Sequence, residues 1–194
     1  MVILRNLRFN GIGTGINGIR FLSGKDLNIE NCYVFGFTTN GVDVALNQGN
    51  PASVHILNSV FKGNGGVGIR ATNAVIPAVQ VSVSETAVIL DTTGIQATGH
   101  SHITVTNEVI QNASSSGLEA DSTTGDAIIT IDRSDISSNV NGATTGGGGF
   151  IITADTKYAF NSGTAFSGGS IFSFGTNRVH NNGSVGTTNP LTQQ

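Results

Sequence analysis

The chain is built from an internal repeat. Eight segments, among them LRNLRFNG, IENCYVFG and ILNSVFKG, align on a common third residue, and these anchor residues lie 20 to 27 positions apart. A unit this short cannot bury a hydrophobic core alone, so neighbouring units must stack and share one. The repeat therefore predicts a solenoid of about eight coils with the anchors Asn6, Asn31, Asn58, Glu85, Asn107, Arg133, Thr156 and Thr176.

Alternating apolar residues indicate that each coil contains three short strands. Positions two and four before the anchor are apolar, ending with the pairs Ile152/Ala154 and Phe172/Phe174, and a further inward position follows three residues after the anchor. This alternation is typical of strands with one buried face. A third strand follows a glycine in every coil, where we expect a corner with positive φ, and its inward residue declines to Thr164 and Ser184 in the last coils.

These patterns predict an all-β fold, a parallel β-helix. We expect the β-helix to cover residues 1–183 and residues 184–194 to form a polar C-terminal tail or cap. Asn6, Asn31 and Asn58 recur at one corner, so their side-chain amides are expected to form a hydrogen-bonded ladder that stops at Glu85.

Two kinds of segment carry a family resemblance. The units LNIENCYVFGFTTNGVDV and VHILNSVFKGNGGVGIRA resemble the repeat of right-handed parallel β-helix proteins, the pectin-lyase-like superfamily. The opening VILRNLRFNGIGTG and the late GGSIFSFGTNRVHNNG are similar to a group of bacterial right-handed β-helix repeat proteins of largely undefined role. The resemblance implies a right-handed helix and a full-length parent that is secreted or held at the cell surface. Because Met1 stands one residue before a strand, without a signal peptide, we expect an N-terminally truncated member.

The charge and the hydrophobicity of the chain argue against some classes of binding partner. The net charge is -3 and the nine Lys and Arg residues are scattered, so no basic stripe for nucleic acid is present in the sequence. No apolar run approaches the roughly 18 residues that span a bilayer, so no membrane span is expected. Polysaccharide remains as the expected partner. The first coil would leave apolar side chains and strand edges open, which predicts self-association at that end.

The outward columns next to the anchors supply the candidate site residues. From the fourth coil onward they become hydroxyls and carboxylates, and Asp132 and Asp155 are expected in one column of adjacent coils, about 5 Å apart. Two carboxylates so close would recruit a cation or, with Lys157 nearby, support acid/base chemistry on a sugar. Asp132, Asp155 and Lys157 are thus the catalytic candidates, and Asp132 and Asp155 the metal candidates. The expected ligand face consists of Thr104, Thr106, Thr130, Asp132, Thr153 and Asp155.

We favour a non-catalytic interpretation of these residues. The β-helix lyases that this fold resembles use calcium-binding acids and a basic proton abstractor, and the related hydrolases use clustered aspartates, but the sequence contains no DD, NTD or RIK motif. We expect an extracellular or surface module that is structural or contacts glycans. We expect this module to need no cofactor, and Ca²⁺ is the alternative. The alternative functions are a polysaccharide lyase or glycoside hydrolase and an ice-binding Ser/Thr face. Two further features bear on the site: Tyr33 and Tyr158 are expected to face outward, and GHSH at 99–102 could offer two histidines to a metal, although a polar loop is the preferred interpretation.

Overall fold

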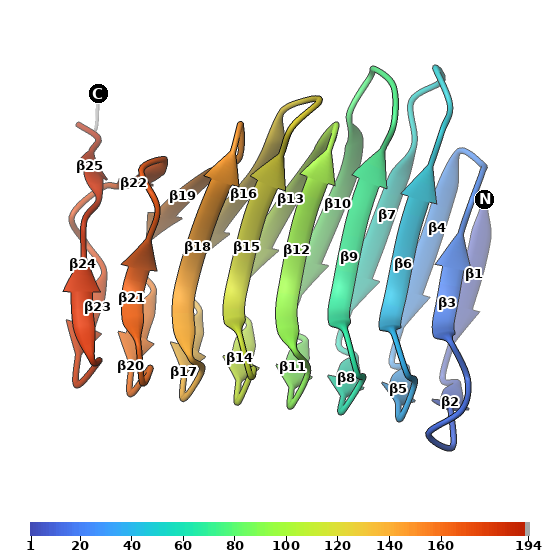
Figure 1. Cartoon of the computed structure of the whole chain (residues 1–194). Coiled ribbons are helices and arrows are strands. Elements are labelled where there is room, and N and C mark those ends of the chain that lie inside the picture. Colours follow the sequence, from blue (N-terminus) through green and yellow to red (C-terminus); the bar gives the residue numbers. More distant parts are fainter. Residues whose placement is uncertain (193–194) are drawn as a thin grey trace.

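The protein is a parallel β-helix. The structure, a computed structural model, describes residues 1–192, and every element in that range is a strand. The coils lie side by side along one axis, with the two chain ends at opposite ends of the solenoid (Figure 1). Three parallel sheets, here named A, B and C, run along it. The predicted all-β fold of eight coils with three strands each is confirmed.

Each coil contributes one strand to each sheet, and the last strand of the chain extends sheet A. Sheet A contains β1 (Val2–Arg5), β4 (Asp26–Glu30), β7 (Ser53–Leu57), β10 (Val79–Ser84), β13 (Ser101–Thr106), β16 (Ala127–Asp132), β19 (Phe150–Ala154), β22 (Ile171–Ser173) and β25 (Asn189–Pro190). Sheet B contains β2 (Arg8–Asn10), β5 (Tyr33–Phe35), β8 (Val60–Lys62), β11 (Ala87–Ile89), β14 (Val109–Gln111), β17 (Asp135–Ser137), β20 (Lys157–Ala159) and β23 (Arg178–His180). Sheet C contains β3 (Asn17–Phe21), β6 (Asn40–Leu46), β9 (Val67–Asn73), β12 (Thr93–Gly99), β15 (Ser116–Ser122), β18 (Asn141–Gly147), β21 (Thr164–Ser167) and β24 (Ser184–Gly186).

The core consists of apolar side chains stacked in register inside the coils. In sheet A, Val81, Ile103 and Ile129 lie on successive strands, and each is at most 2% exposed. Sheets B and C supply equivalent columns, which include Ile110 and Ile95. Burying one such aliphatic side chain contributes about 1.5–3 kcal/mol. The repeat is therefore held together mainly by contacts between like positions of neighbouring coils.

The anchor corner between sheets A and B has a left-handed backbone. Seven consecutive corner residues have φ between 46° and 58°, a region in which asparagine is the commonest residue after glycine. This explains Asn6, Asn31 and Asn58 without a ladder, although Asn58 Nδ2 does donate to Asn31 Oδ1 at 2.6 Å. The seven residues are Asn6, Asn31, Asn58, Glu85, Asn107, Arg133 and Asp155.

The glycines that open sheet C have a different cause from the one expected. Their φ values are not positive; a Cβ on Gly94 would lie 2.5 Å from the carbonyl oxygen of Gly117 in the next coil. The column ends at Ala165, whose carbonyl oxygen would lie 2.6 Å from a Cβ on Gly142. Phe166 then pairs with Ala143 and is buried, so the expectation that Thr164 faces the core is wrong.

The register of the last two coils also differs from the prediction by one residue. The corner of coil seven is Asp155 rather than Thr156, so Ile151 and Thr153 face inward while Ile152 faces outward. The run Phe150–Ile151–Ile152 is apolar at three successive positions, so alternation cannot show which face is buried. In coil eight, Ile171 faces inward and Phe172 outward, again opposite to the expectation.

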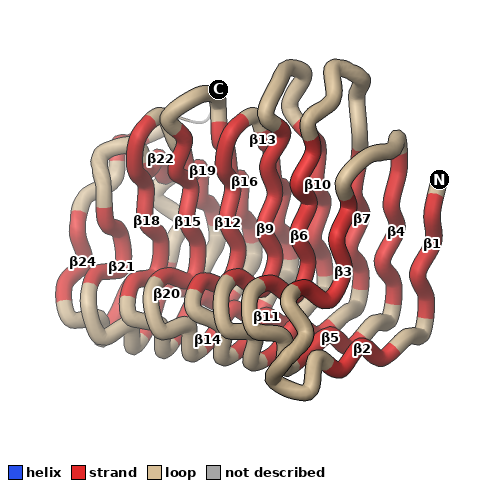
Figure 2. The backbone as a smooth tube through the Cα atoms, turned by 45° about the vertical axis from the view of Figure 1, so that its right-hand side comes forward, coloured by secondary structure: helices blue, strands red, loops and turns tan. Residues whose placement is uncertain are grey.

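The two ends of the solenoid differ. At the C-terminal end, residues expected to form a tail add β24 to sheet C and β25 to sheet A, while residues 193–194 of that tail lie outside the described range. At the N-terminal end, Val2 and Leu7 of the first coil are 51% and 42% exposed. Figure 2 shows the loops between sheets C and A projecting along one edge of the stack.

Candidate functional site

The predicted carboxylate pair is not formed. Asp132 ends β16, and its register partner on β19 is Ala154. Arg133 Nη1 lies 2.7 Å from Asp132 Oδ2. Asp155 occupies the exposed corner one residue further on, where its backbone N–H donates to Thr176 Oγ1. The expectation that Asp132 and Asp155 share a column is therefore wrong, because the register shift in coil seven moves Asp155 out of the strand.

Two other predicted site residues also lie elsewhere. Thr153 is 0% exposed and belongs to the core, where its Oγ1 accepts a hydrogen bond from the hydroxyl of Tyr158 at 3.0 Å. Tyr158, expected on the surface, is likewise fully buried, and burial raises the pKa of its phenol. Lys157 lies in sheet B and pairs with Asp135 at 2.8 Å. The three catalytic candidates thus do not converge on one site.

The remaining predicted residues do form a continuous outer face. Thr104 and Thr130 are register partners on β13 and β16, as are Thr106 and Asp132, and none of the four is buried. From β10 onward the register gives two outward columns, of which one reaches β19 and the other reaches β22. We call these columns the outer strip; they are Gln80–His102–Ile128–Phe150 and Ser82–Thr104–Thr130–Ile152–Phe172.

The outer strip changes character along the solenoid. Its first half carries hydroxyl, amide and imidazole groups, and its second half is apolar. Phe150 is 39% exposed, and its ring packs near parallel to that of Phe172, with 6.1 Å between centroids and an interplanar angle of 26°. These rings border a depression of about 360 Å³ that is lined by Ile128, Phe150, Ile152, Phe172 and Leu191. Sequence reasoning missed this aromatic pair because the register expected for coil eight placed Phe172 inside, whereas the structure places it outside.

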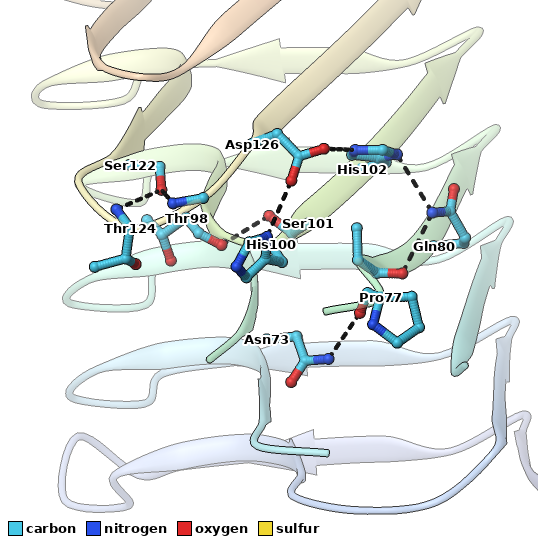
Figure 3. Close-up of polar contacts among 12 residues, drawn as sticks. Asn73, Pro77, Gln80, Thr98, His100, Ser101, His102, Ser122, Thr124 and Asp126 are labelled. Atoms are coloured by element: carbon cyan, nitrogen blue, oxygen red, sulfur yellow. Dashed lines mark hydrogen bonds and ion pairs between the residues drawn. The ribbon is translucent and has the colours of Figure 1, made fainter. Parts of the chain in front are cut away.

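A carboxylate bridges two histidines beside the polar half of the strip. Asp126 Oδ1 lies 3.0 Å from His100 Nδ1, and Asp126 Oδ2 lies 2.8 Å from His102 Nε2. Gln80 Nε2 lies 3.3 Å from His102 Nδ1, which continues the chain of contacts onto the next strand (Figure 3). Both histidine hydrogen bonds lower the pKa of Asp126 to about 2. The two histidines of GHSH thus bind the same carboxylate. Sequence reasoning missed Asp126 because it lies in the loop before β16.

A polar cleft lies near this bridge. The connection from β12 to β13 is His100 alone, whereas the neighbouring coils use residues 74–78 and 123–126. The short connection between two longer ones leaves a cleft of about 490 Å³. It is lined by Thr72, Ala74, Thr98, Gly99, Asp121, Ser122, Thr123 and Thr124.

Two acids lie inside the coils and face no surface site. Glu108 is 1% exposed and belongs to a ladder in which side chains accept backbone N–H groups of the preceding coil. Asp91 is 3% exposed and accepts from the backbone and the side chain of Asn64. Burial raises the pKa of Glu108 to about 8 and that of Asp91 to about 7. The ladder residues are Ser59, Thr86, Glu108, Ser134, Thr156 and Asn177.

Within residues 1–192, no three His, Cys, Asp or Glu side chains are grouped so that they could hold a metal ion. In the same range, no helix is long and apolar enough to cross a membrane. Comparison of the chain with protein-family models, with curated proteins and with solved structures gave no match.

Proposed function

We propose that the protein is a non-catalytic extracellular or cell-surface module that contacts glycans through the outer strip. The observation that supports this most is the stacked pair of Phe150, which is 39% exposed, and Phe172, which is partly exposed. The pair lies at the end of two columns whose first half carries the hydrogen-bonding side chains Gln80, Ser82 and Thr104. Aromatic rings present a large rigid apolar surface, which suits the apolar faces of sugar rings. Hydroxyl and amide groups can both donate and accept, as sugar hydroxyls require.

The arrangement of charges supports a binding module over the enzyme alternative. Asp132 is paired with Arg133, Asp155 lies at a corner, and Lys157 contacts Asp135 in another sheet. A lyase or hydrolase would need these groups around one substrate bond. Two observations argue against the ice-binding alternative. Thr153 is buried in the core, and the column of hydroxyl side chains continues with the apolar Ile152 and Phe172.

The finer family assignment is part of this proposal. We place the chain among the bacterial right-handed β-helix repeat proteins of the pectin-lyase-like superfamily, with a parent that is secreted or surface-bound. The repeat pattern and the three parallel sheets support that placement.

A second proposal concerns self-association. The first coil exposes apolar side chains of β1 and the loop after it, with Val2, Ile3 and Leu7 between 42% and 51% exposed. A shallow apolar depression of about 370 Å³ lies at the same end, bordered by Val2, Leu4 and Leu27 among others. Open strand edges with apolar neighbours favour pairing with another chain. We therefore propose that a second copy packs against this coil.

Binding to glycans is tested with surface variants. Phe150→Ala and Phe172→Ala should each weaken retention on immobilised polysaccharides about tenfold, because each removes one ring of the stacked pair. Phe35→Ala is the matched control, since Phe35 is a partly exposed aromatic residue of sheet B, next to Tyr33. Circular dichroism verifies that each variant folds. If a broad panel of glycans shows no binding to the folded wild-type protein, the proposal is wrong.

A further inference from the structure

The charges around the outer strip are few and already paired. On the sheet A strands from β10 to β22, the only ionisable side chains are His102 and Asp132. Asp132 holds Arg133 at 2.7 Å, and His102 shares Asp126 with His100. Arg133, His100 and His102 thus each contact a carboxylate of the protein, and the exposed His55 of the neighbouring strand β7 contacts Ser82 Oγ through Nδ1 at 2.7 Å. The described sheet A strands from β10 to β22 carry no Lys or Arg side chain that could bind an anionic ligand.

The polar contacts that the strip does offer are uncharged. Ser82, Thr104 and Thr130 present hydroxyls, and Gln80 presents an amide; none of these side chains is buried. The bridge through Asp126 and His102 holds Gln80 in place by a hydrogen bond of 3.3 Å. A side chain that is already ordered loses less conformational entropy when a ligand binds.

The register gives the strip a direction. Each column crosses the strands, so it runs along the solenoid axis rather than along a strand. Four steps from β10 to β22, at about 4.8 Å each, make a path roughly 19 Å long. A chain lying on this path would meet hydroxyls and the Gln80 amide first and the rings of Phe150 and Phe172 last.

We infer that the outer strip binds an uncharged polysaccharide, extended along the solenoid axis, in preference to an anionic one. This inference rests on the proposed function and names the class of glycan. A polyuronate would meet no free Lys or Arg on the strip, and its carboxylates would lie near Asp126 and Asp132, which already hold their own partners, in a protein of net charge -3. A neutral glycan needs no such cation and uses the same hydroxyl and aromatic contacts.

The test compares neutral gluco- and manno-oligosaccharides with oligogalacturonates of equal length, using the whole chain and isothermal titration calorimetry. A neutral oligosaccharide should bind at least about tenfold more tightly than any oligogalacturonate of its length. Its affinity should not change between about 0.02 and 0.5 M NaCl, because screening affects only charged contacts. Phe150→Ala should weaken its binding about tenfold.

Charge variants separate the inference from a merely apolar surface. Asp132→Asn should leave neutral binding within about twofold and strengthen oligogalacturonate binding, because it removes a carboxylate and frees Arg133 for an anionic ligand. Asp155→Asn, which removes a carboxylate away from the strip, is the matched control and should change neither affinity.

The possible failures are distinguishable. If oligogalacturonates bind as tightly as neutral glycans and Phe150→Ala weakens both, the inference about charge is overturned while the proposed function stands. If no glycan of either class binds the folded protein, the proposed function fails and the inference fails with it. Binding that is indifferent to Phe150→Ala would place the glycan elsewhere and refute both.

Discussion

Glu108 makes the stability of this solenoid depend on pH in a direction unusual for a carboxylate. Its side chain is 1% exposed, Oε1 accepts the N–H of Thr86 at 2.9 Å, and Oε2 has no hydrogen-bond partner. Burial raises its pKa from 4.5 to about 8. The folded chain therefore keeps a proton between pH 4.5 and 8 that the unfolded chain releases. It follows that the contribution of Glu108 to the free energy of unfolding is greatest below pH 4.5 and falls as the pH rises toward 8.

The magnitude follows from the interval between the two pKa values. At pH 7, which is about 2.5 units above the pKa of Glu108 in the unfolded chain, Glu108 lowers the free energy of unfolding by about 3 kcal/mol relative to its value at low pH. Asp91, whose pKa is raised to about 7 by burial, acts in the same direction. Between pH 5 and 6.5, Glu108 and Asp91 are both protonated in the folded chain and ionised in the unfolded chain. The unfolding free energy should therefore fall by about 2.7 kcal/mol per pH unit in this range.

Glu108→Gln tests this reasoning. The amide keeps an oxygen that can accept from Thr86 but cannot ionise, so the slope should drop to about half, near 1.4 kcal/mol per pH unit. Urea unfolding followed by circular dichroism at pH 5.0, 5.5, 6.0 and 6.5 measures it, and Asp155→Asn, an exposed corner carboxylate, is the control. The pH dependence of the unfolding free energy is measured instead of its absolute value, because the buried amide of Gln has its own hydrogen-bonding and desolvation cost. An unchanged slope in Glu108→Gln would refute the argument.

The remaining predictions concern packing and association. Gly94→Ala should destabilise the fold by about 3 kcal/mol or more, because its Cβ would lie 2.4 Å from Ile110 Cγ2 and 2.5 Å from the Gly117 carbonyl oxygen. Gly169→Ala, with open space around the added atom, should cost less than about 0.5 kcal/mol in the same urea titration. Val2→Asp should shift the wild-type oligomers toward monomer in light scattering at high concentration, since it places a charge in the exposed first coil; a wild-type protein that stays monomeric at every concentration would contradict the association proposal.

Coils four and five could be predicted from the sequence because their strands in sheet A, β10 and β13, alternate cleanly. Val81, Val83, Ile103 and Val105 leave one register that buries apolar residues, and the structure buries all four. Coil seven has Phe150, Ile151 and Ile152 in succession, so both registers bury apolar residues in the strand itself. In the observed register, Tyr158 and Phe166 are both buried and pack against each other, with 4.6 Å between their ring centroids. Such packing between sheets is not visible in a single strand.

The candidate site was predictable only in part for the same reason. The hydroxyls of Thr104 and Thr130 follow from alternation in two well-defined strands. Phe150 and Phe172 depend on the shifted register. Asp126 depends on a loop whose path brings it back to His102, and loop paths carry no periodic signal. The burial of Glu108 could not be predicted, because a carboxylate is normally exposed. It is buried here because it accepts the backbone N–H of Thr86 within the hydrogen-bonded ladder.

Hydroxyl-radical footprinting with mass spectrometry tests the central claim most directly, because it reports the exposure of single aromatic side chains with and without glycan. Phe150 should be labelled in the free protein, whereas the buried Phe166 should not. On addition of a binding neutral oligosaccharide, labelling of Phe150 and Phe172 should fall while that of Phe35 in sheet B stays constant. Equal labelling of Phe150 and Phe166 would contradict the register, and unchanged labelling of Phe150 at saturating glycan would contradict the outer strip as the binding surface.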